Sequence, residues 1–191
     1  MPKIDSDWKP VAFKEWQVVC DAIANGEQSV ILRKGGISEG KFGFQWIHDQ
    51  FFLFPTLFHE QGKQVRPGKD GAERRFEEGD DHNREIPFSL YIETISTGRL
   101  TDWDEICALE KYHIWTRDCI RERFDWGEEP GISYAVIRAA VAETPWLLSD
   151  RKAFGGCRSW VGLPPEENGG FVDRLTPAEW VVPECGLPDP G

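Results

Sequence analysis

Basic, hydroxyl and imidazole side chains in this sequence stand where strand-like apolar runs end. Arg33 and Lys34 follow one such run and precede two glycines, and Thr56 and His59 follow another. A strand end followed by glycines can point backbone N–H groups and two cations at one phosphate. The imidazole of His59 could serve as a phosphate donor or as a general base. These residue types predict a site for an anionic ligand.

A block near the other end of the sequence has the same character. Within it, Arg158 and Ser159 could contact a phosphate, and Trp160 could offer a stacking platform to a base. Arg138, in a further apolar run, adds a cation. The expected ligand-binding residues are Arg33, Lys34, Thr56, His59, Arg138, Arg158, Ser159 and Trp160.

We expect the strand ends at 33–36, 54–59 and 157–160 to meet at one rim of a sheet, because polar and charged groups are costly to bury unpaired. Such a rim would attract an anion locally on a protein whose formal net charge is −11. A structural alternative stays open for each residue. Lys34 could be a solvated charge at a hairpin end, and Trp160 could belong to the core.

Catalysis is the second hypothesis, with His59 acting on Cys157 or Ser159 as the nucleophile. A catalytic cysteine needs an activated thiolate beside a base. The sequence does not show whether His59 or His113 lies beside the thiol, so the catalytic residues stay unknown. Two-metal nuclease sites need carboxylates and a lysine on one strand, and no such arrangement lies on a predicted strand.

No metal site and no cofactor are expected. Cys107, His113 and Cys119 are the closest candidates for zinc ligands. Structural zinc sites usually pair their ligands at shorter spacings. Residues six positions apart on a helix point away from one another, so this set does not predict a zinc site.

Composition limits the class of protein. A chain of 191 residues suits one domain, and nine Trp, twelve Phe and one Met predict a rigid aromatic core. The net charge of −11 repels nucleic acids and anionic membranes in bulk. The five cysteines form no CxxC pair, and neither a signal peptide nor a membrane-length apolar run is visible. A reduced, cytoplasmic protein without membrane contact is expected.

Periodicity predicts the order of the elements. Apolar residues spaced as on one helix face predict a helix over 11–25, which Asn25 and Gly26 would end. Two short helices are expected after caps at Thr101 and Thr116. Strands are expected at 28–34, 51–54 (stopped by Pro55), 88–95, 134–141 and 158–163.

This order predicts the α+β class, with a mainly antiparallel sheet or small barrel on which the N-terminal helix and the two short helices pack. The single domain is expected to span residues 1–163. Residues 60–86, which are polar and rich in glycine, would form an exposed loop insertion. Residues 164–191 would form a tail rich in proline, glycine and acidic residues.

Six motifs resemble the family catalogued as domain of unknown function 1802, and they are spread over roughly residues 12–163, which is most of the chain. They are Phe13-Lys14-Glu15-Trp16, Leu32-Arg33-Lys34-Gly35-Gly36, Phe54-Pro55-Thr56 with His59, His113-Ile114-Trp115-Thr116, Arg123-Phe124 and Gly156-Cys157-Arg158-Ser159-Trp160-Val161. The resemblance implies no established activity. Some members look associated with restriction-endonuclease-type domains, which implies an accessory role in a restriction or defence system.

Three functions follow from the sequence as hypotheses. The favoured one is a module that binds a phosphate-bearing ligand, a nucleic acid or a nucleotide, through a local basic cleft. The alternatives are an enzyme of unknown type and a protein–protein interaction scaffold with a protein partner.

Overall fold

The computed structural model describes residues 8–34, 44–57, 61–69, 71, 73–74, 85–127, 129–156, 158–164 and 180–181. Within them, six strands form one sheet in the order β2-β5-β4-β3-β1-β6, and β7 also pairs with β5. The strands are β1 (Val11–Trp16), β2 (Val30–Arg33), β3 (Gln50–Thr56), β4 (Glu85–Leu100), β5 (Ile132–Ser149), β6 (Trp160–Gly162) and β7 (Trp180–Val181). The helices are α1 (Gln17–Ala24), α2 (Trp103–Ala108) and α3 (Arg117–Asp125), with 3₁₀ turns η2 (Gln61–Gln64), η3 (Glu110–Tyr112) and η4 (Lys152–Phe154).

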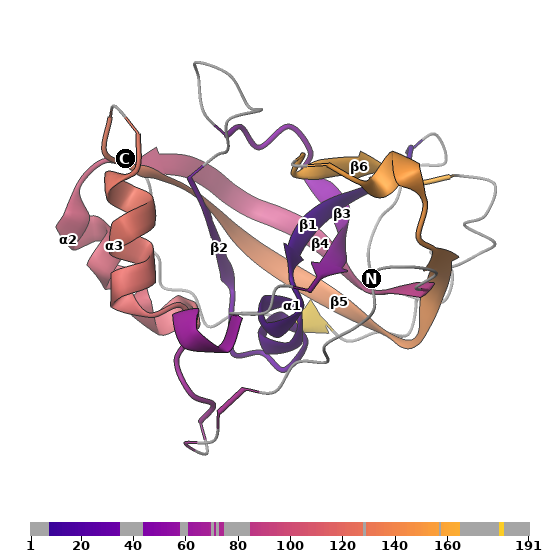
Figure 1. The fold of residues 1–191 in the computed structure, drawn as a ribbon, viewed down its shortest axis with the longest axis horizontal. Coiled ribbons are helices and arrows are strands. Elements are labelled where there is room, and N and C mark those ends of the chain that lie inside the picture. The colour runs from indigo at the N-terminus through magenta and orange to yellow at the C-terminus, as the bar shows by residue number, and fades with distance from the viewer. Residues whose placement is uncertain are drawn as a thin grey trace.

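The sheet is mainly antiparallel, and among the described strands only β1 and β3 run parallel. The long strands β4 and β5 cross the molecule, and α2 and α3 lie together at one end of the sheet (Figure 1). This arrangement confirms the predicted α+β class. None of the described helices is long and apolar enough to span a membrane.

Both faces of the sheet are buried, because successive side chains of a strand point to opposite faces. In β3, Phe51 and Leu53 join the core that the helices cover. Phe52 and Phe54 join a second, smaller core on the other face. The predicted aromatic core is therefore divided into two layers by the sheet.

The helix predicted over 11–25 is wrong in its first half. Residues 11–16 form β1, which pairs in parallel with β3. The helix α1 begins only at Gln17, and Asn25 and Gly26 end it as predicted, Gly26 with a φ of 70°. Pairing with a buried neighbouring strand outweighs an apolar spacing that also suits a helix.

The prediction that Pro55 stops the second strand is also wrong. β3 continues to Thr56, although β4 pairs only with its first residues, Gln50 to Phe52. Pro55 thus lies beyond the ladder with β4. Within that ladder, the N–H that proline lacks would be needed for a hydrogen bond. On the other side, Pro55 is opposite Glu15 of β1.

The remaining predicted strands are confirmed, and β4 and β5 extend well beyond their predicted ends. The two short helices are confirmed as well. Thr116 caps α3, because its side chain accepts a hydrogen bond from the Cys119 amide. Asp102, rather than Thr101, caps α2.

Part of the expected exposed loop at 60–86 packs on the domain instead. Val65 is buried and forms a β-bridge with Trp115, and the Arg66 side chain donates to the Glu110 carbonyl at 2.6 Å. In the expected tail, β7 pairs with β5. Most of the tail lies outside the described residues, and the domain boundary at 163 stays a prediction.

Phe13 lies at the centre of the larger core, so truncating it should be costly. Its ring is 0% exposed and contacts the rings of Phe44, Trp46 and Phe51. We expect Phe13→Ala to lower the free energy of unfolding by about 3–5 kcal/mol in urea denaturation. Ile95→Ala is the control, because Ile95 is 58% exposed and its loss should change the stability by less than about 0.5 kcal/mol. Equal effects of the two substitutions would contradict the core assignment.

Candidate functional site

Two distant edges of the sheet meet at one rim. Arg33 ends β2, and its guanidinium Nη2 donates to the Ser159 hydroxyl, just before β6, at 3.1 Å. Because β2 and β6 stand at opposite ends of the strand order, the sheet must curve until its edges approach each other. The predicted meeting of these two strand ends is observed.

Thr56 lies at the same rim, because β1 and β3 run parallel and end side by side. Its hydroxyl donates to the Glu15 carbonyl at 3.0 Å. One residue earlier, the Lys14 amide donates to the Ser159 carbonyl at 2.8 Å. These bonds hold the ends of β1 and β3 against the start of β6.

A buried carboxylate lies in this rim. Glu15 is 2% exposed, and its Oε1 accepts a hydrogen bond from the Trp16 amide at 2.8 Å. Burial raises the pKa of the Glu15 carboxyl, and the positive charges of Arg33 and Arg123 oppose that rise. The two arginines therefore supply the charge that keeps a carboxylate tolerable in this environment.

Aromatic faces hold both arginines beside Glu15. The Arg123 guanidinium, from α3, lies 3.8 Å from the centre of the Trp115 ring and 5.4 Å from that of Trp16. The Arg33 guanidinium lies 5.4 Å from the centre of the Phe13 ring. Such stacking suits the planar guanidinium group. With two cations and one carboxylate, this cluster carries one excess positive charge when all three groups are ionised.

Trp160 packs into the core rather than standing free as a platform. Its ring centre lies 4.9 Å from that of Phe13 and 5.1 Å from that of Phe51. Rings in mutual contact leave no slot between them for a base. His48, in the segment before β3, lies 4.9 Å from the Trp160 ring. Burial lowers the pKa of this imidazole, against the influence of Asp49.

Lys34 has a structural role. Its ammonium group donates to the carbonyls of Phe124, Glu129 and Gly131 at 3.1, 2.8 and 2.9 Å. A lysine ammonium has three donors, so these bonds use all of them. Lys34 thus ties the end of β2 to the last turn of α3 and the segment after it. The expectation that it holds an anion has no support in this geometry.

Arg138 does not reach the rim. Its Nε donates to the Glu93 carboxylate at 2.8 Å. It stands five residues along β5 from Ser133, the partner of Arg33, which corresponds to about 16 Å of strand. Arg158 is exposed beside Ser159. His59 and Cys157 lie outside the described residues.

The sequence analysis missed Glu15, Arg123 and His48 as members of the site. Glu15 was hidden by the helix assignment, in which it fell outside the apolar stripe. On a strand it shares the face of Phe13, and a charged residue on a buried face is a signal of function or of charge pairing. Arg123 comes from a helix far along the chain, and no local pattern links it to β1. Among the described residues, no three His, Cys, Asp or Glu side chains gather as metal ligands.

The rim lies within a stretch that matches a family model. The model described as Domain of unknown function (DUF1802) matches residues 12–174. The chain belongs to this family. The matched stretch contains every described residue of the rim and extends beyond the predicted domain boundary at 163.

The fold is similar to that of the ASCH protein from Zymomonas mobilis. A mutant form of that protein has a TM-score of 0.51 and 11% sequence identity, over 87% of this chain and 96% of that chain. A second structure of the ASCH protein has a TM-score of 0.48 and 11% identity, over 90% of this chain and 96% of that chain. At this identity the likeness shows the fold alone. No match was found among curated proteins.

The raised pKa of Glu15 gives stability a pH dependence of known sign. In the folded protein the pKa of the Glu15 carboxyl is raised above its usual value of 4.5, so the folded state keeps this proton to a higher pH than the unfolded state does. The unfolding free energy therefore falls as the pH rises through the folded pKa. Gln cannot titrate. We therefore expect Glu15→Gln to gain stability relative to wild type as the pH is raised from about 4 to about 7, in urea denaturation at each pH. Glu143→Gln, at an exposed position, should show no such trend, and a pH-independent difference for Glu15→Gln would contradict the assignment.

The three carbonyl contacts of Lys34 predict a loss of stability without it. Lys34→Met keeps most of the alkyl stem and removes the donors, so we expect a loss of about 1–3 kcal/mol in unfolding free energy. Lys9→Met, at an exposed position, is the matched control and should change stability by less than about 0.5 kcal/mol. A neutral effect of Lys34→Met would leave Lys34 available for a ligand after all.

Proposed function

We propose that this chain is a binding module that holds a phosphate-bearing ligand, a nucleic acid or a nucleotide, at the rim around Arg33 and Ser159. The observation that carries the proposal is the meeting of the Arg33 guanidinium with the Ser159 hydroxyl, 3.1 Å apart, beside a second arginine. This local excess of positive charge lies on a protein with a net charge of −11. Local cations of this kind attract anions even where the bulk charge repels them.

The chemistry of Arg33 fits a phosphate. A guanidinium group has five N–H donors, and among the described contacts Arg33 uses one of them, on Ser159. The side chain is half-buried, and we propose that the ligand accepts from the remaining donors. Charge-assisted bonds from a guanidinium fork to phosphate oxygens are short and strong. Arg158 is exposed and precedes Ser159 in the chain, so we propose that it adds a cation to the same site.

The fold is compatible with this function. The ASCH protein from Zymomonas mobilis shares the fold, and a nucleic-acid ligand is compatible with that likeness. An accessory role in restriction or defence rests on the family resemblance and stays a hypothesis. Between the two ligand classes, a nucleic acid would extend from Arg33 toward the exposed Arg158, whereas a nucleotide would occupy the rim by itself.

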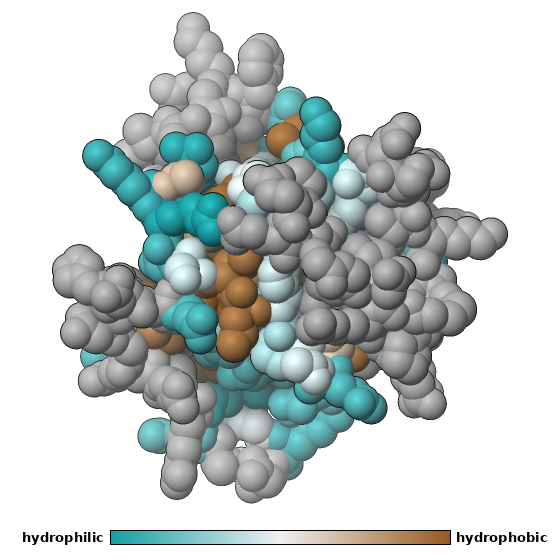
Figure 2. Space-filling model, turned by 90° about the vertical axis from the view of Figure 1, so that its right-hand side faces the viewer, coloured by the Kyte–Doolittle hydropathy of each residue, from teal (hydrophilic) through white to brown (hydrophobic). Residues whose placement is uncertain are grey.

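The alternatives have less support. For an enzyme, Ser159 would need a base, but its hydroxyl meets Arg33, a cation that cannot take up a proton. The other members of that hypothesis, His59 and Cys157, lie outside the described residues. For a scaffold, Figure 2 shows hydrophobic residues at the surface flanked by hydrophilic ones. These residues adjoin one another in one patch on that face (Figure 2). Some apolar surface is normal in proteins, and nothing in the described part of the chain shows what would cover this patch, so it favours no partner.

Binding can be measured by fluorescence anisotropy with labelled single-stranded RNA and DNA oligonucleotides, and with ATP and inorganic phosphate as competitors. We expect affinity to fall as salt rises, because phosphate contacts release counterions. Arg33→Lys and Arg158→Gln should each weaken binding by about tenfold, the loss expected for one charge-assisted bond. Arg33→Lys keeps the charge that compensates Glu15, so the fold should persist while the donor fork is lost.

Arg138→Gln is the matched control, because Arg138 is also an exposed arginine but pairs with Glu93 away from the rim. It should leave affinity unchanged. Binding of labelled ATP, with no binding of either oligonucleotide, would select the nucleotide. If Arg33→Lys and Arg158→Gln bound as wild type does, or no more weakly than Arg138→Gln, the rim would not be the binding site.

A further inference from the structure

A basic segment, residues 151–159, lies between β5 and β6. It contains Arg151, Lys152 and Arg158 and no Asp or Glu, and the side chains of these three cations are exposed. Figure 1 shows the orange turn η4, near the start of this segment, beside β6 and at the opposite end of the sheet from α2 and α3. On a chain with a formal net charge of −11, the basic segment is a local excess of positive charge.

The basic segment is fixed to the sheet at three points. Phe154 is 3% exposed, and its ring centre lies 5.8 Å from that of Phe54 in β3. The Lys14 ammonium donates to the Gly156 carbonyl at 3.0 Å, and the Lys14 amide donates to the Ser159 carbonyl at 2.8 Å. Because the backbone is already held in place, a ligand that binds here has little ordering entropy to offset.

Two cations of the segment have no carboxylate partner. Elsewhere in the chain, Arg74, Arg121 and Arg138 each form an ion pair with a carboxylate. Lys152 and Arg158 form none in the described part of the chain. An ion pair cancels much of the field of a cation, so Lys152 and Arg158 keep their charge for an anion from solution.

Two carboxylates adjoin the segment in the chain and in the sheet. Asp150 directly precedes it, and Glu85 is opposite Ser149 in the ladder of β4 and β5, with both carboxylates at exposed positions. Lys14, which bonds to the segment, adds a fourth cation. Four cations against these two carboxylates leave a local positive excess when all the groups are ionised.

Cations adjoin both faces of the sheet where the basic segment ends. Ser159, its last residue, accepts from Arg33 at 3.1 Å, and Arg33 lies over Phe13 of the larger core. Lys14 points to the opposite face, because successive side chains of a strand alternate. Its ammonium lies 5.6 Å from the centre of the Phe54 ring, in the smaller core. A ligand that contacts Arg33 and also the cations beyond Lys14 must therefore carry several phosphates in series.

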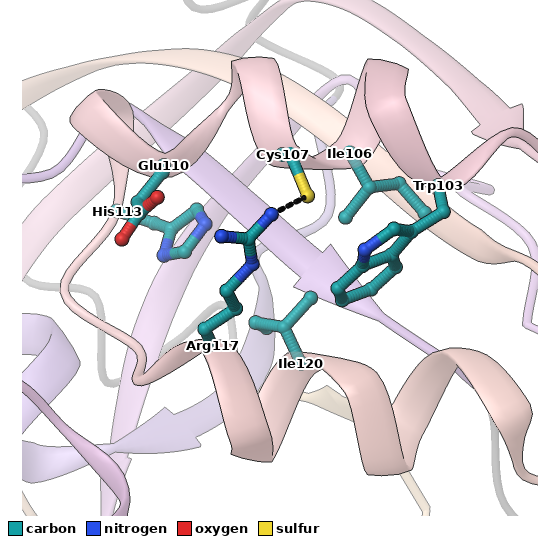
Figure 3. Close-up of a pocket in the computed structure, with 7 residues that line it drawn as sticks. All are labelled: Trp103, Ile106, Cys107, Glu110, His113, Arg117 and Ile120. Carbon is teal, nitrogen blue, oxygen red and sulfur yellow. Dashed lines mark hydrogen bonds between the residues drawn. The ribbon is translucent and has the colours of Figure 1, made fainter.

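The pocket between α2 and α3 offers no comparable set of cations. Its lining residues are Trp103, Ile106, Cys107, Glu110, His113, Arg117 and Ile120. Figure 3 shows Arg117 facing Cys107, whose Sγ accepts from the Arg117 Nη2 at 2.9 Å. The single guanidinium of this pocket is thus engaged inside it, and Glu110 adds a negative charge. The helical end of the molecule does not favour a chain of phosphates.

We propose that the ligand is a single nucleic-acid strand of several nucleotides, whose phosphates continue from the rim along the basic segment to Arg151 and Lys152. The inference rests on the proposed function, because Arg33 holds the strand at the rim. A mononucleotide would end at the rim and leave the basic segment unused. Sites for single strands commonly cover about 4–16 nucleotides. Contacts of cations with phosphates carry no sequence information, so binding along the segment is independent of sequence.

The test is the salt dependence of binding for a labelled single-stranded RNA of about twelve nucleotides, with labelled ATP measured in parallel. One variant combines Arg151→Gln with Lys152→Gln and leaves Arg33, Ser159 and Arg158 in place. We expect it to bind the RNA on the order of tenfold more weakly at low salt. The slope of log affinity against log salt should become shallower by about 1.4, because each phosphate contact to a single strand contributes about 0.7. Its affinity for ATP should equal that of wild type.

The matched control combines Lys111→Gln with Arg117→Gln, which removes one lysine and one arginine at exposed positions on η3 and α3. Its affinity for the RNA and its salt slope should equal those of wild type. An equal loss in this control would overturn the inference, because the total charge would then explain the effect. Wild-type RNA binding by the variant of Arg151 and Lys152 would overturn it as well. The proposed function would stand in both cases if Arg33→Lys still weakened binding.

The remaining outcomes separate the inference from the proposed function. Binding of ATP without binding of RNA would overturn the inference alone. Binding of neither would overturn both. Poly-glutamate is the competitor that tests an acidic peptide. If it displaced the labelled RNA as well as unlabelled RNA does, the surface would select for negative charge rather than for phosphate, and both would fall.

Discussion

A carboxylate buried at the end of β1 determines how the elements around it are arranged. Burying an unpaired charge in a protein interior costs more free energy than a domain can usually offset. Glu15 is therefore stable there only if cations come close, and Arg33 and Arg123 supply them from β2 and α3. Neither β2 nor α3 pairs with β1. Compensation of one charge thus brings together parts of the chain that backbone hydrogen bonding leaves apart.

The same compensation makes the rim suitable for an anion. One carboxylate faces two guanidinium groups, so the cluster retains a positive charge when all three are ionised. Arg33 is half-buried, and among its described contacts the bond to Ser159 uses one of its five donors. A bound phosphate could accept from those donors without removing Arg33 from Glu15. The charge of Arg33 therefore serves stability beside Glu15, while its remaining N–H donors would serve binding.

Local patterns in the sequence correctly predicted those strands and helix caps that depend on neighbouring residues alone. The apolar run before Arg33 is β2, and Thr116 caps α3 as its position before a short helix suggests. The meeting of Arg33 with Ser159 was also predicted, because polar groups at strand ends gather where they can be satisfied together. These predictions needed only propensity and the cost of burial.

The errors arise where distant contacts decide. The spacing of Phe13 and Trp16 suits a helix as well as a strand, and the parallel neighbour β3 selects the strand. Without that neighbour Glu15 looks like an ordinary surface charge. Lys34 looked like a phosphate ligand, because three carbonyls that occupy it lie about a hundred residues away. No local pattern records contacts of that range.

Helix α3 carries two arginines that face different surroundings. Arg117 at its start faces the pocket with Cys107, and Arg123 in its last turn faces Glu15. Six residues of α-helix correspond to about 9 Å along the axis and about one and two-thirds turns, so the two side chains point about 120° apart around the helix. The start of the helix is fixed by the Thr116 cap, and Cys119 bonds to Gln64 at 3.2 Å. Because the helix is anchored between its two arginines, we expect loss of the exposed Arg117 side chain to leave Arg123 in place and the charge balance at the rim undisturbed.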